Sequence, residues 1–194
     1  MNTFNKIINS IKDFNFKISN SFIFRKNIAV SSKIINSGAV SFGKKFSAGY
    51  NSIIWADGKY IKFGDNCHIH PNVFMRLYGG FIETGSNVYI NPFTIIYGHG
   101  GVKIGDNVLI AGHTMIIPSS HNYISKKELI IEQLETSKGI IIGSDVWIGA
   151  HCVIMDGVEI GTGCVIGAGS VVNKSTEPYC VYAGTPAKKI KKRI

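Results

Sequence analysis

Several features that would direct a chain to a membrane, to secretion or to a metal site are scarce here. No apolar run reaches the ~18 residues of a membrane-spanning helix. Residues 1–20 also lack the unbroken apolar stretch of a secretory signal. The four cysteines have none of the paired spacings of a zinc site. Charged residues make up only 17% of the 194 residues and hydrophobic residues 45%, which argues against disorder. We therefore expect one folded, cytoplasmic domain without a metal.

Positive charge is the one strong imbalance of the composition. The 21 basic residues outnumber the 12 acidic ones, for a net charge of +9. Much of this charge lies near the two ends, and no basic and aromatic pattern runs through the middle, so nucleic acid is not an expected partner. The positive charge instead favours a phosphorylated small molecule or an anionic membrane surface as the partner. Phe4, Ile7, Ile8 and Ile11 have helical spacing, which predicts an N-terminal helix that caps the fold or touches a membrane peripherally.

A six-residue period dominates the chain from Phe42 onward. In its last part an aliphatic residue recurs at every sixth position: Ile142, Ile148, Ile154, Ile160, Ile166 and Val172. A period of six fits neither an amphipathic helix nor simple strand alternation. It predicts short strands separated by turns, with three segments to each coil of a solenoid.

The period also defines the expected organisation of the chain. We expect an all-β, parallel β-helix over residues 42–175, a helical cap over residues 1–41 and a basic tail over residues 176–194. Residues 118–139 break the period and should project as a loop. Cys67, Cys152 and Cys164 fall on an inward position, so they should be small core residues rather than nucleophiles. No role is predicted for Cys180.

These segments resemble the hexapeptide repeat of left-handed β-helix acyltransferases, and the left-handed winding is implied by that resemblance. The stretch GSNVYIN ends at Asn91, and His121 follows thirty residues later, in the projecting loop. This arrangement is similar to sugar acetyltransferases of the galactoside and maltose type. The resemblance implies that His121 is the general base and that Asn91 contacts the acceptor. An imidazole suits the role of base, because its ordinary pKa is about 6.5.

Two further residues are candidate substrate contacts through the same resemblance. His99 stands where galactoside-type members have an acidic residue that holds the sugar. Asn122 follows His121 where those enzymes have proline, which points to a different acceptor. Trp147 lies in DVWIGAHCVI, which matches the family closely; its indole would pack on the donor or acceptor, or else form a trimer contact.

The donor expected from the resemblance is acetyl coenzyme A (acetyl-CoA). Small residues of the last coils line its pantetheine arm in the family, and Ala150 and Ala168 match those positions. Asn173 and Lys174 follow at the end of the last coil. The resemblance also places basic residues of the C-terminal segment on the nucleotide phosphates; the candidates are Lys188 and Lys191. The alternative for each lysine is a solvated surface charge.

The expected function is acetyl-CoA-dependent O-acetylation of a sugar hydroxyl by a homotrimer. Its setting would be the assembly of a surface polysaccharide, namely capsule, lipopolysaccharide or exopolysaccharide. The alternatives are an amino-sugar N-acetyltransferase, an antibiotic acetyltransferase, a γ-type carbonic anhydrase and a non-catalytic scaffold. The carbonic anhydrase requires two histidines five residues apart, and none are. His113 and His151 hold equivalent positions in successive coils, so we expect their rings to stack on the outer surface.

Overall fold

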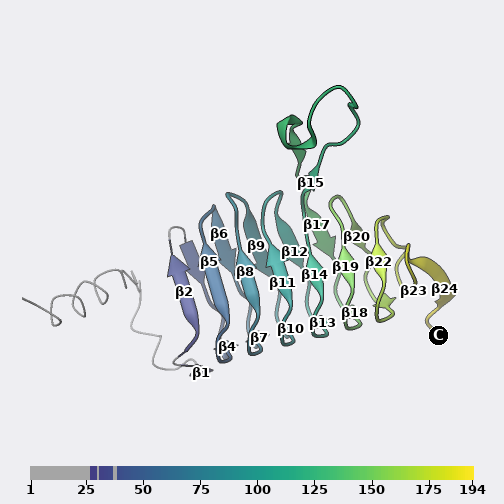
Figure 1. The fold of residues 1–194 in the computed structure, drawn as a ribbon. Helices are drawn as coiled ribbons and strands as arrows, with labels where there is room; N and C mark the ends of the chain where they lie inside the picture. The colour runs from purple at the N-terminus through teal and green to yellow at the C-terminus, as the bar shows by residue number, and fades with distance from the viewer. Residues whose placement is uncertain (1–26, 30, 37–38) are drawn as a thin grey trace, which may run out of the picture.

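The computed structural model describes residues 27–29, 31–36 and 39–194, which wind into the left-handed parallel β-helix predicted above (Figure 1). Each coil contributes one short strand to each of three sheets, here called A, B and C. Sheet A contains β1 (Asn27–Ile28), β4 (Ser47–Ala48), β7 (His68–Ile69), β10 (Tyr89–Ile90), β13 (Leu109–Ile110), β18 (Trp147–Ile148), β21 (Val165–Ile166), β23 (Cys180–Ala183) and β24 (Lys188–Lys192). Sheet B contains β2 (Lys33–Asn36), β5 (Ile53–Ala56), β8 (Phe74–Arg76), β11 (Ile95–Tyr97), β14 (Met115–Ile116), β19 (Val153–Ile154) and β22 (Val171–Val172). Sheet C contains β3 (Ala39–Ser41), β6 (Tyr60–Lys62), β9 (Phe81–Thr84), β12 (Val102–Ile104), β17 (Ile140–Ile142) and β20 (Glu159–Ile160).

Aliphatic side chains that point inward form a ladder along the axis. The six residues of the period are all at most 1% exposed: Ile142, Ile148, Ile154, Ile160, Ile166 and Val172. Parallel pairing keeps them in register, so that Ile148 lies between Ile110 and Ile166. Cys67, Cys152 and Cys164 are 0% exposed, which confirms them as small core residues.

Asparagines at the corner between sheets C and A allow the chain to turn. Asn66, Asn87 and Asn107 have φ angles of 56°, 58° and 58°, in the left-handed region that asparagine tolerates better than most residues. Their side chains also join successive coils. The amide of Asn66 donates to Asn87 at 2.8 Å, and the amide of Asn87 donates to Asn107 at 2.9 Å.

Both ends of the β-helix differ from the expected boundaries. The predicted N-terminal helix falls on residues 1–26, outside the described residues. Strands β1 to β3 pair with β4 to β6, so described coils begin well before Phe42. Residues 176–194 are not a simple tail, because β23 extends sheet A and β24 folds back on it. This hairpin covers backbone groups that a final coil would leave unpaired. Arg193 anchors it by donating to the carbonyl of Gly163 at 2.7 Å and to Asp145 at 2.9 Å.

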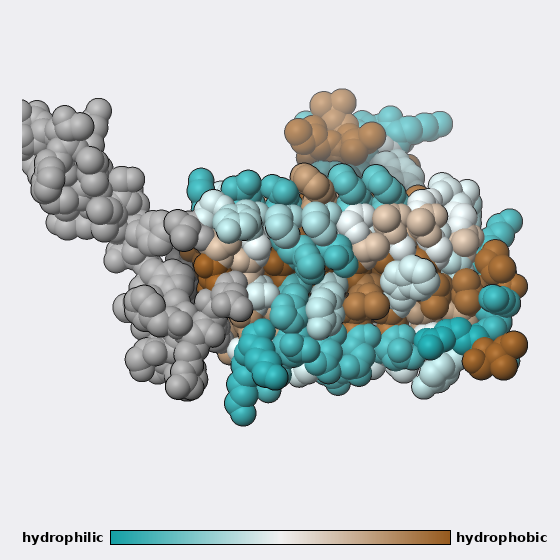
Figure 2. All heavy atoms as spheres, turned by 90° about the horizontal axis from the view of Figure 1, so that it is seen from below, coloured by the Kyte–Doolittle hydropathy of each residue, from teal (hydrophilic) through white to brown (hydrophobic). Residues whose placement is uncertain are grey.

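Residues 118–139 leave the helix between sheets B and C and project from it (Figure 1). The loop contains β15 (Ser120–His121), the 3₁₀ helix η2 (Ile130–Glu132) and β16 (Glu135–Thr136). Hydrophobic side chains gather on it (Figure 2), and Ile124, Ile131 and Leu134 are 84–85% exposed. The regular phase resumes without a register shift, since β17 pairs with β12. No helix in the described part of the chain is long and apolar enough to cross a bilayer.

The inward ladder generates a test within one strand. Ile142 is 1% exposed, whereas its neighbour Ile141 points outward and is 47% exposed. Ile142→Ala should lower the free energy of unfolding by about 2–5 kcal/mol because it leaves a cavity. Ile141→Ala should lower it by less than about 1 kcal/mol. Urea denaturation measures both values, and equal losses would contradict the assigned inward and outward faces.

Candidate functional site

The base of the projecting loop lies against a glycine-rich turn of the preceding coil. This turn, residues 98–101, lies at the corner where the chain passes from sheet B to sheet C. The amide of Gly100 donates to the carbonyl of Pro118 at 3.4 Å, on the first stem of the loop. A Cβ on Gly100 would collide with the carbonyl of Ser137, on the second stem. The turn that carries His99 therefore lies against both stems of the loop that carries His121.

His121 lies on the first stem and faces Glu135 on the second. The two residues are paired across the antiparallel strands β15 and β16, and His121 Nδ1 lies 3.4 Å from Glu135 Oε1. Both side chains remain accessible, at 63% and 50% exposure. Thr136, next to Glu135, donates to Asp156 at 3.2 Å, which ties the second stem to the body. The contact on Nδ1 leaves Nε2 as the nitrogen that can meet a substrate proton.

His99 is held among aromatic rings one coil before the loop. Its ring stacks on Tyr78 at 4.5 Å and lies edge-on to Tyr97 at 5.8 Å. Desolvation lowers the pKa of His99, and the opposing charge of Glu135 does not cancel this effect. Its Nδ1 is buried and has no hydrogen-bond partner among the described residues. A buried polar atom of this kind is rare in a folded protein.

A charged pair on sheet B, which the sequence analysis missed, continues this cluster. Arg76 donates through Nε to Asp57 at 2.6 Å, and its guanidinium lies 3.8 Å from the centre of the Trp55 ring. It also lies 4.2 Å from the centre of the Tyr78 ring. Burial raises the pKa of Asp57, but the hydrogen bond from Arg76 and those from backbone amides outweigh burial, so the net pKa is lowered.

A signal for this cluster was present in the sequence. Trp55, Arg76 and Tyr97 occupy equivalent outward positions of successive sheet B strands, as their pairing shows. They also follow each other at 21-residue intervals, the length of one coil. An aromatic, a cationic and a second aromatic residue in one outward row could therefore have been noticed from the repeat alone.

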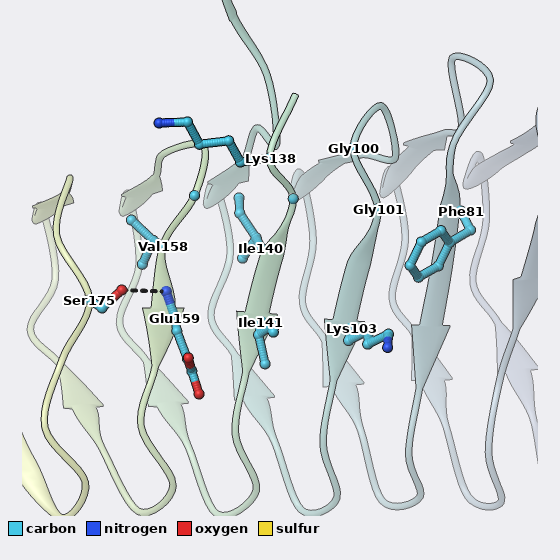
Figure 3. Close-up of a pocket in the computed structure, with 12 residues that line it drawn as sticks. Phe81, Gly100, Gly101, Lys103, Lys138, Ile140, Ile141, Val158, Glu159 and Ser175 are labelled. Atoms are coloured by element: carbon cyan, nitrogen blue, oxygen red, sulfur yellow. Dashed lines mark hydrogen bonds between the residues drawn. The ribbon is translucent and has the colours of Figure 1, made fainter. Parts of the chain in front are cut away.

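A shallow groove of about 320 Å³ crosses sheet C on the other side of the loop stems (Figure 3). Phe81 and Lys103 lie toward one end and Glu159 toward the other, with Ile141 between them. Lys138, at the end of the second stem, lies at the rim. The loop base is thus flanked by the groove and by the Arg76 cluster, which consists of Arg76, Asp57 and the rings of Trp55, Tyr78 and Tyr97.

The remaining candidates lie on sheet A or at other corners. Asn91 is at the corner between sheets A and B, where its side-chain amide donates to the Ile110 carbonyl at 2.9 Å. A single chain therefore places Asn91 and His121 at different corners. His113 and His151 stack at 4.7 Å with an 8° angle between their rings, which confirms the expected surface stacking.

Trp147 belongs to an outward row of sheet A that ends at Lys191. Pairing aligns Trp147 with Val165, Val165 with Val181 and Val181 with Lys191. Trp147 is 53% exposed, so about half of the residue remains open to a ligand or a partner. At about 4.8 Å per strand, the row is ~14 Å long. We call these four residues the donor row.

The other donor candidates are divided between two corners. Ala150 and Ala168 hold equivalent places at the corner next to the donor row, where the Gly169 amide donates to Ala150 at 2.8 Å. Lys188 pairs with Ala183 at the edge of sheet A. Asn173 and Lys174, in contrast, follow β22 and lie where the chain leaves sheet B, at the corner on the side of sheet C. The structure therefore groups three of these five residues with Trp147 and Lys191, and separates Asn173 and Lys174 from them.

No group of three histidine, cysteine, aspartate or glutamate side chains is placed to hold a metal ion within residues 27–29, 31–36 and 39–194.

Sequence comparisons relate the repeat to known transferases. A family model described as bacterial transferase hexapeptide, with six repeats, matches residues 139–174. The chain is 30% identical over 168 residues to an Escherichia coli protein named for O-acetyl transfer in lipopolysaccharide biosynthesis, covering 82% of this chain and 74% of that protein. It is 41% identical over 132 residues to the galactoside O-acetyltransferase of Escherichia coli, covering 68% of this chain and 57% of the relative.

Other relatives match over shorter lengths. A Lysinibacillus sphaericus protein named for macrolide acetyl transfer is 57% identical over 64 residues, 33% of this chain. The matched region spans only 36% of that relative, compared with 57% of the galactoside enzyme. High identity is thus concentrated in part of the chain.

Two solved structures share most of the fold. A hexapeptide-repeat acetyltransferase of Vibrio cholerae, in complex with acetyl-CoA, superposes with a TM-score of 0.60 at 31% identity, over 66% of this chain and 68% of that one. A mutant of the N-acyltransferase AntD of Bacillus cereus, in complex with dTDP and coenzyme A, superposes with a TM-score of 0.63 at 27% identity. That match covers 84% of each chain.

The environment of His99 predicts a pH dependence of stability. Because the folded-state pKa of His99 is lowered, the unfolded chain binds a proton that the folded chain does not. The free energy of unfolding should therefore fall as the pH drops from about 6.5 toward the folded-state pKa. His99→Asn should flatten this part of the profile, whereas His113→Asn, on another corner, should not. Urea denaturation between neutral and mildly acidic pH measures the slope; equal slopes in wild type and His99→Asn would refute the prediction.

Proposed function

The chain belongs to the hexapeptide-repeat transferase family, and from this premise we propose that it transfers an acetyl group from acetyl-CoA to a sugar hydroxyl. The observation that carries the proposal is His121 on the stem of the projecting loop, with Nδ1 against Glu135 and Nε2 available. An accessible imidazole beside a carboxylate is suited to act as a general base. The contact with Glu135 holds the ring by Nδ1 and directs Nε2 away from the loop stem.

The proposed reaction needs one proton carrier and one acyl donor. His121 Nε2 takes the proton of the acceptor hydroxyl as its oxygen attacks the thioester carbonyl. The carbon–sulfur bond then breaks, and the imidazolium returns the proton to the departing thiolate of coenzyme A. The products are an acetyl ester and free coenzyme A, and His121 is neutral again.

The donor row fits the shape of the proposed donor. It offers an exposed indole at one end and the cationic Lys191 ~14 Å away at the other. We propose that the thioester end of acetyl-CoA lies near Trp147 and that its phosphates lie near Lys191 and Lys188. The small side chains of Ala150 and Ala168 leave room for the pantetheine arm between them.

The donor row and His121 belong to different parts of one chain, sheet A and the corner between sheets B and C. We propose that a second copy completes each site, in a homotrimer with three equivalent sites between neighbouring chains. One chain would then supply His121 and the next would supply the donor row.

The proposed setting is surface polysaccharide assembly in the cytoplasm. The lipopolysaccharide and galactoside relatives support a sugar acceptor, and the four free, buried cysteines suit a reducing compartment. N-acylation of an amino sugar is the second candidate, because AntD, an N-acyltransferase, superposes over 84% of the chain. Alkaline hydrolysis of the product separates the two, since an ester is cleaved and an amide is retained.

Replacement of His121 tests the mechanism. Loss of a general base costs roughly 10²–10⁴ in rate, so His121→Ala should lower kcat for acetyl transfer by about that factor. The thermal midpoint should barely change because the ring is exposed. Release of coenzyme A with a panel of sugars measures kcat. His113→Ala, which removes an exposed ring on another corner, is the matched control. A His121→Ala enzyme that retains more than about a third of the wild-type kcat would refute the mechanism.

Subunit complementation tests the shared site. His121→Ala alone and the double variant Trp147→Ala/Lys191→Ala should each have little activity. A co-refolded equal mixture should regain about a quarter of the wild-type rate, because random assembly restores that share of the interfaces. If both groups acted within one chain, the mixture would remain as inactive as its components.

A further inference from the structure

The Arg76 cluster forms a continuous path of contacts to the base of the loop. Arg76 lies over the Tyr78 ring, and Tyr78 stacks on His99. The His99 turn lies against both loop stems, where Glu135 faces His121. Strand β8, which carries Arg76, is two strands from β14, from which the loop departs. That separation along the axis is about 10 Å.

Asp57 holds Arg76 in place through Nε and does not engage its terminal nitrogens. Asp57 accepts only the Nε–H of Arg76, and the other oxygen of Asp57 accepts the backbone amides of Leu77 at 3.1 Å and Tyr78 at 3.0 Å. The guanidinium is fixed between two aromatic rings, yet 29% of the side chain is exposed. The terminal nitrogens of an arginine so placed present a rigid, planar pair of donors.

We propose that Arg76 binds an anionic group, a carboxylate or phosphate, of the acceptor, so that the substrate is an acidic glycan rather than a neutral sugar. This inference rests on the proposed function and names the substrate class of that same site. Arginine donors match both anions in a two-point contact. The rings of Trp55 and Tyr97, in the same outward row as Arg76, provide apolar surface for the sugar rings.

The distribution of charge around the cluster orients the acceptor. Glu135 lies at the His121 end and would repel an anion, whereas Arg76 lies at the far end. The charged group is therefore bound near Arg76, and the hydroxyl to be acetylated lies near His121. The strands at the two ends, β8 and β14, are about 10 Å apart along the axis, a spacing that an acceptor of two or more sugars would span.

A structural role for Arg76 predicts different behaviour from a binding role. If the pair with Asp57 only joins two coils, removing it lowers stability without changing recognition. Lys62 and Glu83 provide the comparison, since they also join neighbouring coils, at 3.1 Å, but on sheet C. Lys62→Gln removes one positive charge, as Arg76→Gln does, and leaves the proposed site intact.

Trp55 provides a readout that does not require catalysis. The protein has two tryptophans, so in a Trp147→Phe background the fluorescence comes from Trp55, against which Arg76 packs. D-Glucuronate or glucose 6-phosphate should cause a saturable fluorescence change at millimolar concentration, and glucose should not. Arg76→Gln should weaken this binding at least tenfold, Arg76→Lys should weaken it less, and Lys62→Gln should leave it unchanged. Circular dichroism shows whether each variant is folded. If Arg76→Gln does not fold, Arg76→Lys is the variant on which the test is decided.

The outcomes separate this inference from the proposed function. Equal responses to glucose and glucuronate, no response to either anion, or undiminished anion binding in both Arg76 variants would overturn the inference. A response to only one of the two anions identifies the group that is recognised and supports the inference. Anion binding at Arg76 without acetyl transfer to any acidic oligosaccharide would overturn the proposed function instead. If the enzyme acetylates neutral oligosaccharides, and Arg76→Gln has the same KM for the acceptor as the wild type, the proposed function is supported and the inference is overturned.

Discussion

The parallel hydrogen bonds between successive coils are the interaction on which the rest of this structure depends. Each short strand pairs with equivalent strands about one coil earlier and later, so a two-residue strand such as Trp147–Ile148 is stable only within the stack. The same pairing places Ile148 on Ile110 and Ile166 and thereby builds the core. Backbone pairing and side-chain burial are therefore consequences of one repeat, and a change in phase would disrupt both.

This regularity confines chemistry to outward positions, to corners and to the one long insertion among the described coils. Inward positions are occupied by the packed ladder. Outward positions of one row vary instead, as Trp55, Arg76 and Tyr97 do. His121 can project from the body because residues 118–139 interrupt the winding while β17 still pairs with β12. His99 also differs from the repeat, since its glycine-rich turn approaches the loop stems closely and its Nδ1 atom is buried without a hydrogen-bond partner among the described residues.

The sequence was sufficient for the architecture because the repeat is a local signal. The inward ladder at Ile142 to Val172 and the buried cysteines followed from a period of six alone. Spatial relations between coils were harder to foresee. The contact between His121 and Glu135 joins residues fourteen apart across a loop whose hairpin has no periodic signal. The position of Arg76 between two rings depends on rotamers and on Asp57 in the coil before it. The β23–β24 hairpin was missed because the six-residue period ends before it.

The stack also sets a length scale for the proposed site. Adjacent strands are about 4.8 Å apart, so any outward row measures distance along the axis in fixed steps. Three steps separate Trp147 from Lys191 on sheet A, and two separate the strand of Arg76 from the strand that precedes the loop on sheet B. Because these rows lie on different faces, the proposed homotrimer would bring a donor on one chain and an acceptor on its neighbour together at His121. A site of this kind can change acceptor through outward residues such as Arg76 while the inward ladder, and hence the fold, stays the same.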